Sequence, residues 1–148
     1  MKEDQSKLLE KIIIKGSMKP SWHNSAGYKV ELNGVKFFSP FECFNTYVLG
    51  EGDNEHKVRV NDETYIKIKS WIQEKIVPYL CKGGNKVCSS YGIKHMAEDQ
   101  LGFYVSNETV KIIMCELGVI KKRNKVQWDI NLYYPYKGII GIEKYERM

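Results

Sequence analysis

The chain has 148 residues, of which 43% are hydrophobic and 12% aromatic, enough to fill the core of one domain. This composition argues against an intrinsically disordered chain. The formal charge of +5 is mild. It permits contact with nucleic acid or with an acidic protein surface, although an ordinary solvated surface explains it equally well.

No segment has the sequence of a membrane span or a signal peptide. The apolar runs, such as residues 12–14 and 112–115, are far shorter than the roughly 20 residues that cross a bilayer. Charged residues near the start, Lys2, Glu3, Asp4 and Lys7, interrupt any signal-peptide pattern. We therefore expect a cytoplasmic protein of a bacterial host cell that makes no membrane contact.

The first part of the chain predicts a helix, a hairpin and a second short helix. Residues 2–15 carry an apolar stripe at helical spacing, so residues 1–16 are expected to form an N-terminal helix that Gly16 ends. Residues 17–27 are turn-rich and predict a linker. Asn33-Gly34, between two extended runs, is a strong hairpin signal. Ser39, Pro40 and Glu42 resemble a capping box for a helix that includes Tyr47 and Val48. Residues 17–61 thus form a hairpin and short helix, with a possible strand at 58–60.

Residues 62–148 are predicted to form a long helix and a winged helix-turn-helix-like unit, all within one α+β domain. The long helix spans residues 62–81, and Pro78 should end it near Val77. A serine at 89 or 90 should cap the next helix, whose expected inward residues are Tyr91, Met96, Ala97 and Leu101. Ser106 or Asn107 should cap a further helix, which Gly118 ends. Residues 119–120 and 126–134 are then expected to pair as a hairpin, with Val126, Trp128, Ile130 and Leu132 on one face.

Two helices followed by a hairpin is the element order of a winged helix-turn-helix, in which the second helix enters the major groove and the wing contacts the backbone. The residues expected to face the groove are Asn107, Thr109, Lys111 and Ile112. Those expected to contact phosphates are Lys121, Lys122, Arg123 and Lys125, at the hairpin tip. Glu108 and Glu116, expected on the same exposed helix face, oppose this interpretation. The alternative to a DNA-binding wing is a structural hairpin whose lysines only keep the surface soluble.

Part of this unit carries a resemblance. Residues 90–98 are Ser-Tyr-Gly-Ile-Lys-His-Met-Ala-Glu and residues 102–107 are Gly-Phe-Tyr-Val-Ser-Asn, followed by Met114 and Gly118. The order resembles a module of small uncharacterised proteins from bacteriophages, prophages and plasmids, with S-Y-G-L-K-H-x-x-E, G-x-Y-V-S-N and A-M-x-x-A-G. Ile93 replaces the leucine, and Ile113 and Leu117 replace the alanines. The resemblance covers about residues 85–135 and implies a mobile-element origin, and it implies nothing about catalytic residues.

Two functions fit a basic phage protein of this size. One is nucleic-acid binding, most plausibly to duplex DNA, as a regulator or replication accessory. The other is inhibition of a host defence complex, an anti-CRISPR-like role exerted by protein–protein binding to a host nucleoprotein effector. The partner surface would then include the same lysines or the aromatic residues Trp22, Tyr133, Tyr134 and Tyr136. A homodimer remains open in both cases.

The sequence gives no pattern for catalysis or metal binding, so we expect a non-enzymatic protein without a cofactor. His23, His56 and His95 are isolated along the chain, and Cys81, Cys88 and His95 have the spacing of no standard zinc site. Trp22-His23-Asn24 lacks a second nearby histidine for nuclease chemistry. The four widely spaced cysteines (43, 81, 88 and 115) are expected to be reduced thiols.

Overall fold

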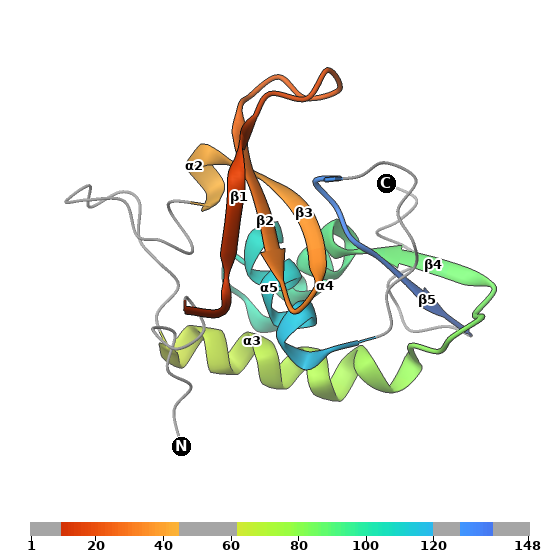
Figure 1. Cartoon of the computed structure of the whole chain (residues 1–148). Coiled ribbons are helices and arrows are strands. Elements are labelled where there is room, and N and C mark those ends of the chain that lie inside the picture. The colour runs from red at the N-terminus through yellow and green to blue at the C-terminus, as the bar shows by residue number, and fades with distance from the viewer. Residues whose placement is uncertain (1–9, 45–61, 120–127, 138–148) are drawn as a thin grey trace.

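The computed structural model describes residues 10–44, 62–119 and 128–137, which form a small α+β domain, the fold class that the sequence predicts. Its elements, in chain order, are β1 (Ile13–Met18), β2 (Gly27–Leu32), β3 (Val35–Pro40), α2 (Phe41–Phe44), α3 (Asp62–Lys75), the 3₁₀ turn η2 (Val77–Tyr79), β4 (Lys86–Ser89), α4 (Ser90–Leu101), α5 (Asn107–Leu117) and β5 (Tyr133–Tyr136). Figure 1 shows the β1–β3 sheet on one side of α5, with α3 running along the base of the molecule.

The predicted hairpin is confirmed. β2 and β3 pair antiparallel, and Asn33 and Gly34 turn the chain with φ values of 52° and 79°. Because side chains alternate across a strand, each strand has one face toward the helices and one face outward. Val30 and its cross-strand partner Phe37 face the core, whereas the other faces of both strands point away from it.

The predicted N-terminal helix is wrong for residues 13–15, which belong to strand β1; residues 2–9 lie outside the described residues. β1 pairs antiparallel with β2, and a register shift between Ile14 and Gly16 marks a bulge where Gly16 has a φ of +145°. β-branched isoleucines suit a strand, and a short apolar run does not distinguish the two structures by its periodicity. Residues 17–27 are not a linker either, because Met18 pairs directly with Gly27.

The capping role predicted for Ser39 is also wrong. Ser39 and Pro40 belong to β3, where Ser39 pairs with Tyr28, and α2 begins only at Phe41. The Phe41 N–H donates to the carbonyl of Ala26 at 3.2 Å, so the backbone of the neighbouring loop satisfies the first donor of this short helix. The remainder of the predicted short helix and the strand at 58–60 lie outside the described residues.

The three longer helices are close to the predictions. α3 ends at Lys75, and η2, which contains Pro78, follows it. Ser89 and Ser106 cap α4 and α5: their hydroxyls accept the N–H groups of Gly92 and Thr109, each at 3.0 Å. Gly102 and Gly118 end the same helices in the left-handed conformation. One inward residue is wrongly assigned, since Tyr91 is 50% exposed.

The expected wing is not formed as predicted. β5 begins at Tyr133, and it pairs with β4, which precedes α4, rather than with the residues that follow α5. Residues 128–132 are not in a strand, and residues 120–127, which include the basic run, lie outside the described residues. Within the described ranges, no helix is long and apolar enough to cross a bilayer.

Candidate functional site

The side chains expected to face a DNA groove lie inside the protein. Lys111 is fully buried, and Thr109 and Ile112 are each 3% exposed, while Asn107 is half-buried. α5 packs against β2, α3 and α4 at once, so little of its circumference reaches solvent. The predicted exposure of these residues is therefore wrong, and α5 does not present them to a duplex. Lys121, Lys122, Arg123 and Lys125 lie outside the described residues.

The two glutamates expected on an exposed face of α5 are also placed differently. Glu108 is buried beside Lys111. Glu116 is half-buried, accepts the hydroxyl of Tyr65 at 2.8 Å and lies 3.0 Å from the ammonium of Lys69. Both carboxylates are paired inside the protein, so they would not repel a phosphate backbone and do not oppose nucleic-acid binding.

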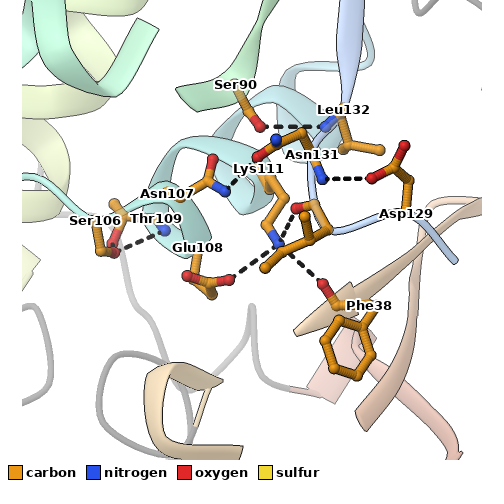
Figure 2. A network of polar contacts seen from close by, with 11 residues as sticks. Phe38, Ser90, Ser106, Asn107, Glu108, Thr109, Lys111, Asp129, Asn131 and Leu132 are labelled. Atoms are coloured by element: carbon orange, nitrogen blue, oxygen red, sulfur yellow. Dashed lines mark hydrogen bonds and ion pairs between the residues drawn. The ribbon is translucent and has the colours of Figure 1, made fainter. Parts of the chain in front are cut away.

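Lys111 holds three parts of the chain together (Figure 2). Its ammonium donates to the carbonyl oxygens of Phe38 at 3.1 Å and Ile130 at 2.7 Å, and it lies 3.0 Å from Oε1 of Glu108. The ring of Phe37 lies beneath the ammonium, with its centroid 4.9 Å away. A buried charge requires partners of this kind. Lys111 thus joins α5 to β3 and to the segment that precedes β5.

Further hydrogen bonds fix that segment, residues 129–132. Phe38 N–H donates to the carbonyl of Asp129 at 3.0 Å, and Asn107 Nδ2 donates to Oδ1 of Asn131 at 2.8 Å. Leu132 and Ser90 form two hydrogen bonds. The N–H of Ser90 donates to the carbonyl of Leu132 at 2.8 Å, and the N–H of Leu132 donates to the hydroxyl of Ser90 at 3.1 Å. Figure 2 shows the Asn107–Asn131 contact and a Ser90–Leu132 contact around Lys111. The segment is tied to β3, α4 and α5, which determines where Trp128 lies.

Trp128 lies against the outward face of the β1–β3 sheet. The ammonium groups of Lys29 on β2 and Lys36 on β3 are each 5.8 Å from the centroid of its ring, within the range of cation–π contacts. The backbone φ of Trp128 is +62°, a conformation that bulky residues rarely adopt and that strains the chain. The anchored segment therefore holds the aromatic ring near two lysines, on a backbone in a strained conformation.

Phe38 of β3 lies on the same face and is covered by the β1–β2 connection. Its ring makes edge contacts with Trp22 and His23, at centroid distances of 5.6 and 5.2 Å. Trp22 remains 43% exposed. We call the four residues Trp22, Lys29, Lys36 and Trp128 the outer sheet face. Its two aromatic rings and two cations, which lie beside the carboxylate of Glu31, the cross-strand partner of Lys36, give it a different chemistry from the apolar inward face.

The sequence interpretation missed Lys29 and Lys36, although a signal for them exists. Both alternate with core residues, Val30 and Phe37, on either side of the confirmed Asn33-Gly34 turn, so strand periodicity places them on the outward face. The aromatic surface proposed for a protein partner is partly wrong, because Tyr134 and Tyr136 are buried.

The described residues contain no candidate metal site. Within residues 10–44, 62–119 and 128–137, no group of three or more His, Cys, Asp or Glu side chains is placed so that it could hold a metal ion. His23 Nδ1 accepts the N–H of Ser25 at 3.1 Å, and the ring of His95 packs edge-on against Tyr91. All four cysteines are free thiols, and Cys88 and Cys115 are buried.

Comparisons with protein families, curated proteins and solved structures find no match to this chain.

Proposed function

We propose that this protein binds nucleic acid through the outer sheet face, with single-stranded segments as the preferred form. The observation that carries the proposal is the placement of the ammonium groups of Lys29 and Lys36 within 5.8 Å of the centroid of the Trp128 ring. Single-strand binders combine cations that contact phosphates with aromatic rings on which bases stack. Trp22 and Trp128 supply rings, and the two lysines supply the charge.

The basic run of the sequence supports the same surface. Lys121, Lys122, Arg123 and Lys125 precede Trp128 closely in the chain. The mild net charge of +5 is consistent with binding that depends on a local cluster rather than on the whole surface. Binding by the sheet face replaces insertion of α5 into a duplex groove, because the buried side chains of α5 are not available for base contacts.

The test is a titration of a short fluorescent oligonucleotide, single-stranded or duplex, at several salt concentrations. We expect the single strand to bind more tightly, and binding to weaken steeply with salt as counterions are released. Changing Lys29 and Lys36 together to Gln should reduce the slope of log K against log salt by about 1.4, at roughly 0.7 per phosphate contact.

The matched control changes Lys67 and Lys75, two exposed lysines of α3, to Gln. This variant loses the same charge from another part of the molecule, so an equal loss of affinity would show a general charge effect and contradict the proposed surface. A second variant with Ala at Lys121, Lys122, Arg123 and Lys125 measures the contribution of the basic run.

If no oligonucleotide binds at low salt, the proposal fails and inhibition of a host defence complex becomes the better hypothesis. A defined host nucleoprotein that co-purifies with the wild-type chain would then be the expected finding.

A further inference from the structure

The turn between β2 and β3 contains the only Asn-Gly pair of the sequence, Asn33-Gly34. Both residues are exposed, and both have a positive φ, 52° and 79° respectively. Glycine has no Cβ, and no atom lies within 4 Å of the point where a side chain at position 34 would begin. The turn is therefore open to water, and no neighbouring group crowds Gly34.

This arrangement favours one intramolecular reaction, the deamidation of Asn33. The backbone nitrogen of Gly34 attacks Cγ of Asn33 and loses its proton, a cyclic succinimide forms, and the Cγ–Nδ2 bond breaks with release of ammonia. Water then opens the ring at either of its carbonyls and leaves an aspartate or an isoaspartate at position 33. A side chain on the following residue would obstruct ring closure, and glycine has none. Asparagine is a thermolabile residue because of such reactions.

The amide that this reaction removes holds the hairpin to the end of α5. Nδ2 of Asn33 donates to the carbonyl of Cys115 at 2.9 Å, and the same carbonyl accepts the N–H of Gly118, at the end of the helix, at 3.1 Å. Beside this contact lies a hollow of about 160 Å³, whose lining includes Val35 and Met114. The hydrogen bond of Asn33 thus bridges a place where the hairpin and α5 are not closely packed.

Deamidation would replace this attraction by a repulsion. Nδ2 is a donor, whereas an ionised carboxylate has only acceptor oxygens. One of these oxygens would face the carbonyl of Cys115, near the end of α5, where the helix dipole is negative and disfavours an anion. An aspartate at position 33 therefore loses the hydrogen bond and adds an unfavourable charge. An isoaspartate also lengthens the backbone within a tight turn.

We infer that Asn33 is a modification site of this protein, at which spontaneous deamidation separates the β2–β3 hairpin from the end of α5. The reaction needs no ligand or partner, and so it is independent of the proposed function. Folding slows it without preventing it, because the bond to Cys115 holds the amide in one orientation while the turn stays exposed to water.

The first test follows the chemistry in the full chain at mildly alkaline pH and physiological temperature. Peptide mass spectrometry measures, at each asparagine, the mass gain that accompanies replacement of –NH₂ by –OH. We expect this gain at Asn33 before any other described asparagine (24, 85, 107 and 131), because each of those precedes a residue with a side chain. In denaturant, Asn33 should react roughly two- to tenfold faster, the factor that corresponds to loss of one hydrogen bond. A native chain in which Asn33 stays unmodified, or reacts after another of these asparagines, would overturn the inference.

The second test measures the structural effect of the product. Asn33→Asp should lower the urea midpoint of unfolding by about 0.5–1 M, because a hydrogen bond is lost and a charge is placed near the end of a helix. The control is Asn85→Asp, the same chemical change at an exposed loop residue, which should shift the midpoint by less than about 0.3 M. An Asn33→Asp protein as stable as the wild type would overturn the inferred separation of the hairpin from α5.

A third variant connects the two measurements. Asn33→Gly suits the positive φ at this position and has no amide to lose. During the alkaline incubation the urea midpoint of the wild-type protein should fall as the modified fraction grows, whereas that of Asn33→Gly should stay constant. Equal losses of stability in the two proteins would show that the damage arises elsewhere, and would contradict the role assigned to Asn33.

Discussion

The ammonium of Lys111 lies 3.0 Å from the carboxylate of Glu108, one turn earlier in α5, and both side chains are almost completely buried. Neither group is at a protein surface, so their main effect is on the internal structure. The ammonium also satisfies the carbonyls of Phe38 and Ile130, and through them it connects the outer sheet face to the helices. Stability and the placement of Trp128 should therefore depend on the same side chain.

We predict that Lys111→Met lowers the free energy of unfolding by about 3–5 kcal/mol, because it leaves a buried carboxylate without its counter-charge. Urea denaturation followed by circular dichroism measures the change. Lys67→Met is the control, since Lys67 forms an exposed pair with Glu63 at 3.7 Å and should change stability by less than about 0.5 kcal/mol. Equal effects of the two substitutions would show that the burial of Lys111 is not energetically important.

The sequence predicts the parts of this fold that depend on interactions between residues close together in the chain. Ser89, Ser106 and the Asn33-Gly34 turn act on backbone groups only a few positions away, so their roles follow from the sequence. Strand β1 forms because it can pair with β2, and β5 pairs with β4, which lies two helices earlier in the chain. Such non-local pairings leave only weak signals in a single sequence.

The exposure of the α5 residues was predicted incorrectly for a related reason. The apolar stripe of α5 predicts one buried face, whereas residues 109–115 are buried all round. The sequence does carry a hint, because only Lys111 and Thr109 interrupt the apolar residues of this stretch, and helices that are hydrophobic on all sides are usually interior. Besides Glu108, the partners of Lys111 include two carbonyl groups distant in sequence, which no local pattern reveals.

Tyr134→Phe should raise the stability of the protein by up to about 1 kcal/mol. The hydroxyl of Tyr134 is buried and has no hydrogen-bond partner among the described residues, so its removal ends a desolvation cost. Tyr65→Phe is the opposite case: it loses the hydrogen bond to Glu116 and should lower stability by about 1 kcal/mol. Urea denaturation of both variants at neutral pH measures this contrast, and a destabilised Tyr134→Phe protein would contradict it.

The same tyrosine predicts a pH dependence. Burial raises the pKa of Tyr134 well above its usual value of 10.0. Above pH 10 the unfolded chain releases this proton while the folded chain retains it, so the wild-type protein loses stability as pH rises. Tyr134→Phe lacks this contribution, and its stability advantage should therefore grow above pH 10. A constant difference between the two proteins across that range would argue against the raised pKa.

Cys43 should be alkylated slowly in the folded protein. Its pKa of about 11 leaves only about one molecule in a thousand as thiolate at pH 8, compared with about one in ten at the usual value of 9.0. Iodoacetamide labelling, followed by peptide mass spectrometry, should thus be at least about tenfold slower in the native chain than in denaturant, because the greater nucleophilicity of the more basic thiolate offsets part of its lower population. The native rate should rise with pH up to about pH 11. Equal rates in the two states at pH 8 would show that burial and Glu108 do not hold the thiol protonated.

Trp128→Gly should separate binding from stability. Glycine adopts a φ of +62° without strain, and relief of a left-handed conformation at a bulky residue is worth about 1–3 kcal/mol. Loss of the cation–π contacts and the greater flexibility of glycine in the unfolded chain offset part of this gain. We therefore expect stability within about 1 kcal/mol of the wild type, together with at least a fivefold loss of affinity for a single-stranded oligonucleotide.

Trp128→Tyr is the matched control for that variant, because it retains an aromatic ring and the strained backbone. Oligonucleotide titration should show affinity close to wild type for Trp128→Tyr and weak binding for Trp128→Gly. If Trp128→Gly instead binds normally, the ring is not part of the interface, and the strain at this position has no role in binding. If both variants lose stability by several kcal/mol, the indole acts mainly in packing near Lys29 and Lys36. A role for the strained Trp128 in contacting nucleic acid is supported only if Trp128→Gly loses affinity while it keeps its stability.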